Sequence, residues 1–211
     1  MPQPPVSAQP APSPPSGPPP AAENVPPTAG EYVEQGVASW YGPLFNGRRT
    51  SDGEVYNMHE FTAAHRTLPF GAMVRVTNLA NGLQTEVRIN DRGPFVANRI
   101  IDLSLSAARA IQMVGPGTVQ VRLEMISGPD PGSGVFAVQV GAFKTEENAD
   151  RVRSQLSERF SPVATIPVAV SNGRFYRVRV GRFPSEAAAR ALAEELRAAE
   201  QLAVFVVRLD N

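Results

Sequence analysis

The stretch MVRVTNLANGLQTEVRIND, residues 73–91, decides the first part of the fold. Apolar and polar side chains alternate in MVRVTN (73–78) and again in QTEVRIN (84–90), as they do in half-buried strands. Asn81-Gly82 stands between the two runs, and this dipeptide favours a tight turn between paired strands. The stretch therefore predicts an antiparallel hairpin.

The β pattern continues on both sides of this hairpin. Alternating runs predict further strands at residues 35–40 and 118–126. Between them, residues 105–113 have helical spacing, and Ser104 or Asp102 could cap that helix. Many short strands with one helix in about 95 residues are typical of a small β-barrel. We therefore predict a mainly-β barrel domain over residues 31–127.

An internal repeat follows a linker at residues 128–134. FAVQVGAF (136–143) and YRVRVGRF (176–183) share the pattern V-x-V-G-x-F. An amphipathic helical stretch follows each run, and Thr145 and Ser185 are the expected N-caps. With two more predicted strands, at 163–170 and 203–209, the order is β-α-β-β-α-β. This order predicts an α+β split βαβ (ferredoxin-like) domain over residues 135–211.

Composition limits the classes of function. Residues 1–30 hold twelve of the 21 prolines, which predicts a disordered Pro-rich linker or tail. The absence of cysteine excludes disulfides and thiol nucleophiles. A net charge of zero gives no sign of nucleic-acid binding. Two histidines and scattered carboxylates show no metal-ligand spacing, so neither a metal nor a cofactor is expected.

The side chains suited to chemistry lie in three fragments of the barrel domain. These are SDGEVYN (51–57) with Glu54, TAAHRTLPFG (62–71) with His65, and RINDRGPF (88–95) with Asp91. Each residue also has a purely structural interpretation. Asp91 could bond its own turn, Glu54 could be a solvated loop acid, and His65 could be a satisfied core residue.

Together with ASWYG (38–42) and RIIDLS (99–104), these fragments resemble the double-psi β-barrel of the rare lipoprotein A family. That family comprises septal lytic transglycosylases. The repeat unit resembles a SPOR domain, which binds peptidoglycan, and the order of the two domains is that of the family. The resemblance implies a periplasmic protein of the division septum, with an outer-membrane lipid anchor on the precursor. We also expect a monomer.

The reaction that the resemblance implies is endolytic cleavage of the MurNAc-GlcNAc β-1,4 bond in peptide-free glycan strands, with formation of 1,6-anhydroMurNAc. Because the C6 hydroxyl of the sugar attacks C1, one carboxyl group can donate one proton and accept another. The resemblance implies Asp91, Glu54 and His65 as catalytic residues. Asp91 is the first candidate for the acid, although the residues alone do not decide between Asp91 and Glu54. We expect His65 to orient a carboxylate or to bond a sugar hydroxyl.

Several neighbours are candidate substrate contacts. Trp40 and Tyr41 are adjacent, so in a strand they face opposite sides, one toward the substrate and one toward the core. Asn90 and Arg92 flank Asp91 and are expected either to hold substrate or to lower the pKa of Asp91, which would argue against its role as the acid. Asp102 in the IDLS motif is expected to be a cap or turn residue.

In the repeat unit, strand alternation separates a valine-rich face from a face that the helices leave open. The expected glycan-binding residues of the open face are Gln139, Phe175, Arg177 and Arg179. An aromatic ring beside amide and guanidinium donors suits a sugar ring, although an ordinary solvated face would look similar. Ala142 stands where SPOR domains often have a serine.

Two other functions fit the same residues. One is a non-catalytic, expansin-like protein that binds glycan in the cell envelope without cutting it. The other is a hydrolase that uses Glu54 and Asp91 as a pair, for which carboxyl groups roughly 5–9 Å apart are needed.

Overall fold

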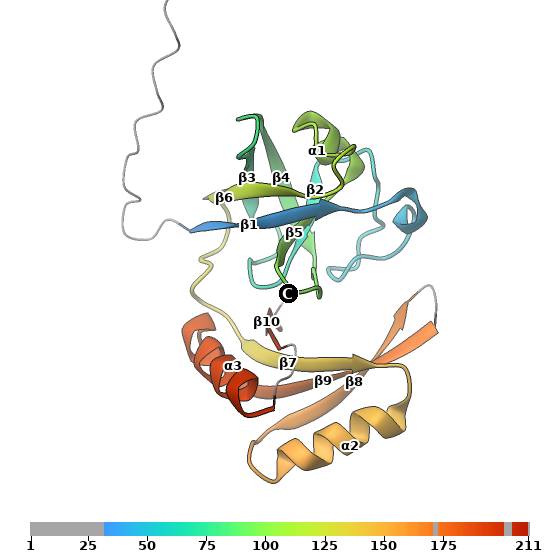
Figure 1. Ribbon diagram of the computed structural model, residues 1–211, viewed down its shortest axis with the longest axis vertical. Coiled ribbons are helices and arrows are strands. Elements are labelled where there is room, and N and C mark those ends of the chain that lie inside the picture. The colour runs from blue at the N-terminus through green and yellow to red at the C-terminus, as the bar shows by residue number, and fades with distance from the viewer. Residues whose placement is uncertain (1–31, 171–172, 201–203, 211) are drawn as a thin grey trace, which may run out of the picture. The chain divides into compact units, whose positions relative to one another are not determined.

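The computed structural model describes residues 32–170, 173–200 and 204–210 (Figure 1). The predicted Pro-rich linker at residues 1–30 lies outside these residues. The first part of the described chain consists of β1 (Val33–Trp40), η1 (Pro43–Phe45), β2 (Thr62–His65), β3 (Met73–Asn78), β4 (Gln84–Asp91), β5 (Arg99–Leu103), α1 (Leu105–Ala110) and β6 (Val119–Ser127). Among the described residues, no helix is long and apolar enough to cross a membrane.

The first six strands close into a barrel in the order β1-β5-β2-β4-β3-β6, which confirms the predicted architecture. The predicted hairpin is β3 and β4, in which Val74 lies opposite Val87. The pairs β1–β5 and β2–β4 are parallel, and the other pairs are antiparallel. Inward side chains from β3, β4 and β6 fill the barrel and are fully buried: Val74, Val76, Val87, Ile89, Val121 and Leu123.

The middle of the barrel contains a strand that alternation does not predict. All four residues of β2 are buried, so its side chains show no alternation, and β2 pairs with β4 on one side and with β5 on the other. Helix α1 is shorter than predicted, and the Ser104 side chain caps it by accepting from the Ala107 amide at 3.2 Å. Asp102 lies within β5, so its expected role as a cap or turn residue is wrong.

The second part of the chain consists of β7 (Phe136–Phe143), α2 (Glu146–Ser157), β8 (Val163–Val170), β9 (Gly173–Phe183), α3 (Glu186–Glu200) and β10 (Phe205–Arg208). The strands form an antiparallel sheet in the order β10-β7-β9-β8, as expected for a split βαβ unit. Thr145 caps α2 by accepting from the Asn148 amide, and Ser185 accepts from the Ala188 amide at the start of α3.

Both helices pack on the same face of this sheet (Figure 1). The face is the valine-rich one, as predicted, and Val138 of β7 and Val178 of β9 are fully buried there. Helix α3 supplies Leu196 to this core, and α2 supplies Leu156. The two strands of the internal repeat therefore turn their polar alternate residues away from the helices.

Candidate functional site

Asp91 is the last residue of β4, and hydrogen bonds fix its carboxylate. The Oδ1 atom accepts from the Ser51 amide at 2.9 Å, the Ser51 hydroxyl at 2.6 Å and the Arg92 amide at 2.8 Å. The Oδ2 atom accepts from the Tyr41 hydroxyl at 3.1 Å. Three donors on one oxygen and one on the other leave Oδ2 as the oxygen with room for another partner.

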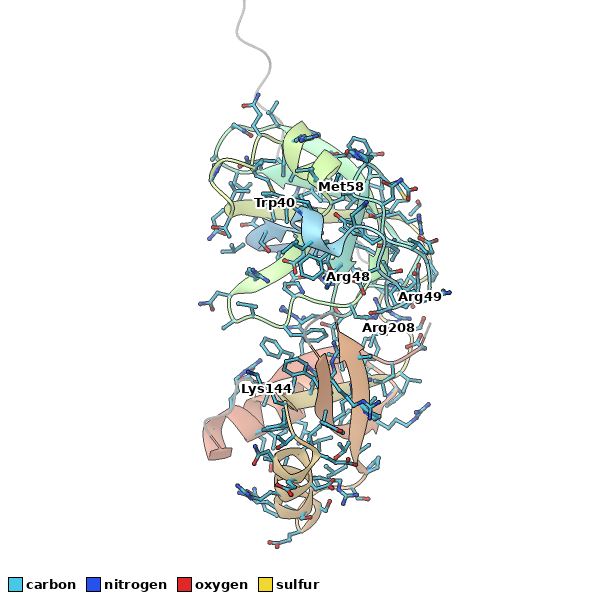
Figure 2. The ribbon with its side chains drawn as sticks, turned by 90° about the vertical axis from the view of Figure 1, so that its right-hand side faces the viewer. Trp40, Arg48, Arg49, Met58, Lys144 and Arg208 are labelled. Atoms are coloured by element: carbon cyan, nitrogen blue, oxygen red, sulfur yellow. The ribbon has the colours of Figure 1, made fainter. Side chains whose placement is uncertain are left out.

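Tyr41 and Trp40 are adjacent in the sequence, but their side chains have different contacts. Tyr41 is anchored by its amide, which donates to the Leu103 carbonyl at 2.9 Å. Burial, and then the negative charges of Asp91 and Asp102, raise the pKa of Tyr41 well above its usual value, so its hydroxyl remains a neutral donor. Trp40, labelled in Figure 2, packs against the barrel core. Of the two aromatic residues, only Tyr41 contacts the Asp91 carboxylate.

Glu54 is held in an ion pair. Two nitrogens of Arg88 donate to its two carboxylate oxygens, each at 2.9 Å, and the Asn90 amide donates to Oε2 at 3.0 Å. The Arg88 hydrogen bonds, and secondly that of Asn90, lower the pKa of Glu54. Glu54 is therefore ionised near neutral pH.

One tight loop carries both Ser51 and Glu54 to β4. Its two sides are joined by hydrogen bonds from the Gly47 amide to the Tyr56 carbonyl at 2.8 Å and from the Tyr56 amide to the Arg48 carbonyl at 2.7 Å. Gly53 has a φ of 95°, a conformation that favours glycine at the turn. The loop, which we call the 47–56 loop, therefore links the two candidate carboxylates.

His65 is 2% exposed and turns to a different carboxylate. Its Nδ1 accepts from the Thr67 and Leu68 amides at 3.2 and 3.0 Å, so Nε2 carries the proton and donates to Glu34 Oε2 at 2.9 Å. Burial, the largest influence, raises the pKa of Glu34, but the hydrogen bonds and charge of its neighbours, His65 first, lower it to about 2. The structure does not bring the His65 ring into hydrogen-bonding contact with Asp91 or Glu54.

Asn90 and Arg92, expected to hold substrate, are engaged within the protein. Asn90 is 3% exposed and donates to Glu54. The Arg92 guanidinium donates to the Leu68 carbonyl at 2.8 Å and lies 3.6 Å from the centre of the Phe70 ring. Burial lowers the pKa of Arg92 to about 10. Both side chains support the walls of the site.

Asp102 places a further carboxyl group near the site. Ala64 of β2 lies opposite Asp91 on one side and opposite Asp102 on the other. The Ser39 hydroxyl donates to Asp102, and Arg99 lies 3.5 Å away. Burial raises the pKa of Asp102, opposed by Ser39 and Arg99. Sequence reasoning missed this placement because no local pattern shows that β5 runs beside β2.

In the repeat unit, the sheet register groups the predicted glycan-binding residues. Gln139 lies opposite Arg179 on one side and opposite Phe205 on the other, so these three side chains share a face. Arg177 and Phe175 continue the same face at two-residue spacing. Phe205 was missed because β10 is distant in sequence from the repeat motif. Gln139 is 2% exposed, so it is not on the open surface that the alternation predicted. Gln139 Oε1 and Arg179 Nε are buried without a hydrogen-bond partner among the described residues.

Two further observations concern this face. Burial, and then the neighbouring charge of Arg177, lower the pKa of Arg179 to about 10. Ala142 is exposed and lies opposite Arg177. The face therefore combines two guanidinium groups, an amide and two aromatic rings, without a hydroxyl at residue 142. Elsewhere in the described chain, no cluster of three histidine or acidic side chains is suited to hold a metal ion.

Two parts of the chain match known domain families. Residues 33–123 match the family described as lytic transglycolase, and residues 132–208 match the SPOR domain. The chain is thus a double-psi β-barrel followed by a SPOR domain. It is 43% identical to the endolytic peptidoglycan transglycosylase RlpA of Neisseria meningitidis, over 78% of this chain and 72% of that protein. This chain therefore belongs to the RlpA family.

Another relative in the same family is much longer than the part that this chain matches. The Helicobacter pylori protein, also named endolytic peptidoglycan transglycosylase RlpA, is 45% identical over 77% of this chain and 49% of its own length. The chain thus spans about half the length of that relative. A solved expansin of Clavibacter michiganensis is 12% identical, with a TM-score of 0.38 over 73% of this chain and 91% of that one, a likeness too low to support an argument.

Proposed function

We propose that this chain is an endolytic peptidoglycan lytic transglycosylase in which Asp91 transfers the protons. The observation that carries the proposal is the unequal occupation of the Asp91 oxygens. Oδ1 accepts three hydrogen bonds, and Oδ2 accepts one, from Tyr41. A fixed carboxyl group with one open oxygen is what proton transfer to a glycosidic oxygen requires. The names of the curated relatives support the same reaction.

In the proposed mechanism, protonated Asp91 donates its Oδ2 proton to the glycosidic oxygen as the bond from C1 to that oxygen breaks. The C6 hydroxyl of the MurNAc residue then bonds to C1, and the Asp91 carboxylate accepts the hydroxyl proton. One bond breaks, one bond forms, and the proton returns to Asp91. No water is consumed, so the product ends in a 1,6-anhydro sugar.

Glu54 is a poorer candidate for the acid than Asp91, because the positively charged Arg88 guanidinium bonds both of its oxygens and lowers its pKa, whereas the donors on Asp91 are neutral amides and hydroxyls. We assign it an electrostatic role. The transition state of glycoside cleavage resembles an oxocarbenium ion, and a nearby carboxylate stabilises that positive charge. Its hydrogen bonds also connect the 47–56 loop to β4, so Glu54 positions the donors on Asp91 as well.

We infer that His65 supports catalysis indirectly, by holding the backbone near Asp91 in place. Its ring joins the end of β2 to Glu34 of β1, and its carbonyl accepts from Arg92 at 3.4 Å. These contacts fix the backbone that precedes Gly93, next to Asp91. His65 is therefore proposed as a positioning residue.

The SPOR domain is proposed to hold the same polymer. The sheet face opposite the helices carries the half-buried Phe175, Arg177 and Arg179 beside the buried Gln139, so hydrogen-bond donors lie next to aromatic rings there. We propose that it selects peptide-free strands, and that this places the protein in the periplasm at the division septum. A lipid anchor on an outer-membrane precursor fits the same location.

The test is digestion of purified peptide-free glycan strands, with products read by mass spectrometry. The wild type should produce anhydro ends, and Asp91→Asn should produce none while still binding the strands. Asp130→Asn, in the linker, is the matched control and should cleave normally. Reducing ends, which are one water heavier, would assign a hydrolase instead. No new ends from the wild type, with binding retained, would leave a glycan-binding protein and overturn the proposal.

A further inference from the structure

Exposed apolar side chains gather on the segments that surround Asp91. Leu44 is 82% exposed, Phe45 is 44% exposed and Val55 is 60% exposed. Leu44 and Phe45 belong to η1, directly before the 47–56 loop, and Val55 belongs to the loop itself. A single exposed apolar side chain is ordinary at a protein surface, so exposure alone assigns no role to Leu44 or Val55. Phe45 differs, because its ring packs on Tyr41 beside Asp91.

Phe45 is connected to the catalytic carboxylate by direct contacts. Its ring centre lies 5.3 Å from that of Tyr41, at an interplanar angle of 50°. The Tyr41 hydroxyl in turn donates to Asp91 Oδ2 at 3.1 Å. Tyr41 also packs on Tyr56, again at 5.3 Å between ring centres. Phe45 is thus the exposed outer member of an aromatic cluster whose inner member bonds the oxygen assigned to proton transfer.

Arg48 adds a polar group to the same surface. Its guanidinium lies 5.2 Å from the centre of the Phe45 ring, and Figure 2 shows Arg48 and Arg49 on the loop after β1. Among the described residues, no acidic side chain forms an ion pair with Arg48, and its contact with the ring holds hydrogen-bond donors beside an exposed aromatic face. A pyranose ring presents C–H groups on its face and oxygens at its rim, and this arrangement matches both.

We propose that Phe45 stacks on a sugar ring of the glycan strand next to the cleaved bond, while Arg48 donates to the oxygens at the rim of that ring. The proposal rests on the proposed function, because it names the substrate contact at the same site. Glu54 and Arg88 then supply charged groups to the site, and Phe45, through its contact with Tyr41, supplies an apolar surface.

The first test measures cleavage of peptide-free strands by Phe45→Ala, Phe45→Trp and Leu44→Ala. For Phe45→Ala, KM should rise about tenfold, the factor expected when roughly half of a phenyl ring is covered, with kcat nearly unchanged. Phe45→Trp should retain the wild-type KM. Leu44→Ala, a more exposed neighbour, should not change it. An unchanged KM in Phe45→Ala, or a loss of kcat alone, would overturn the proposal.

A second measurement separates this proposal from the catalytic one. Asp91→Asn combined with Phe45→Trp gives a chain that should bind without cutting, and the new tryptophan reports contact at residue 45. Its fluorescence should change on adding peptide-free glycan, after subtraction of the signal of Asp91→Asn alone. Asp91→Asn with Leu44→Trp is the control. If the wild type cleaves nothing but this signal changes, the proposed reaction fails and the stacking site stands. If cleavage occurs without the signal, the stacking site fails.

Discussion

The candidate site residues of the barrel and of the SPOR sheet differ in how completely they are hydrogen-bonded. In the barrel, Asp91, Glu54 and His65 each form two or more side-chain hydrogen bonds. On the SPOR sheet, Gln139 Oε1 and Arg179 Nε are buried without a hydrogen-bond partner among the described residues. Groups whose positions are fixed before substrate arrives suit catalysis, whereas a buried polar atom without a partner costs free energy that a bound ligand can recover by bonding it. The comparison therefore fits catalysis in the barrel and ligand binding on the sheet.

The largest expected effect tests whether the barrel is the domain that cleaves glycan. Asp91→Asn should lower the cleavage rate by about 10³-fold, because it removes a general acid and base. Binding to glycan should persist, because the SPOR face is unchanged. Single-turnover rates and pelleting with purified strands measure the two quantities. Equal loss of both would contradict the division of tasks between the domains.

The second effect concerns the hydrogen bond from His65 Nε2 to the Glu34 carboxylate. The pKa of Glu34 in the folded protein is about 2, against an ordinary value of 4.5. A lowered folded pKa adds stability above pH 4.5, on the order of 3 kcal/mol, which is lost as pH falls toward 2. Glu34→Gln lacks this contribution. The difference in free energy of unfolding between wild type and Glu34→Gln should therefore shrink between pH 5 and pH 2.

Denaturant titrations at several pH values measure that difference. Glu86→Gln is the control, because Glu86 pairs with Arg75 on the surface and is half exposed. If the free energies of unfolding of wild type and Glu34→Gln change with pH in the same way, the contact between Glu34 and His65 does not stabilise the barrel.

A smaller effect is expected from Tyr41→Phe, which removes the donor to Asp91 Oδ2 and keeps the ring. One lost hydrogen bond should lower kcat about tenfold. Thermal unfolding should change little, since the contacts with Phe45 and Tyr56 remain. A wild-type kcat in Tyr41→Phe would mean that the donors to Oδ1, Ser51 and the Arg92 amide, are enough to orient the Asp91 carboxylate.

The smallest expected effect tests glycan binding by the SPOR sheet. Arg177→Ala should weaken binding to peptide-free strands about fivefold, through loss of a charged hydrogen-bond donor. Lys144→Ala, which removes one positive charge elsewhere in the same domain, is the matched control. Isothermal titration with soluble strands measures the affinities. Equal weakening by both variants would indicate nonspecific charge attraction rather than recognition by the sheet face.

The sequence predicted those structural elements that depend on neighbouring residues along the chain. The β3–β4 hairpin, the repeat strands and the helix caps at Thr145 and Ser185 follow from alternation and capping, and all are confirmed. Strand β2 was not predicted, because it is buried on both faces and shows no alternation. The partners of the site residues were also missed. Ser51 lies 40 residues from Asp91, and Glu34 lies 31 residues from His65, so only barrel closure brings them together.

The closure of the barrel has a consequence for how such domains can be combined. Its first strand pairs with its last, and Val33 lies opposite Glu124. The chain therefore enters and leaves the barrel on adjacent strands, close to each other. A unit with neighbouring ends can be spliced into a longer polypeptide or joined to a different targeting module without stretching its own fold. The barrel can therefore be joined to another domain at either end without a change in its own strand pairing.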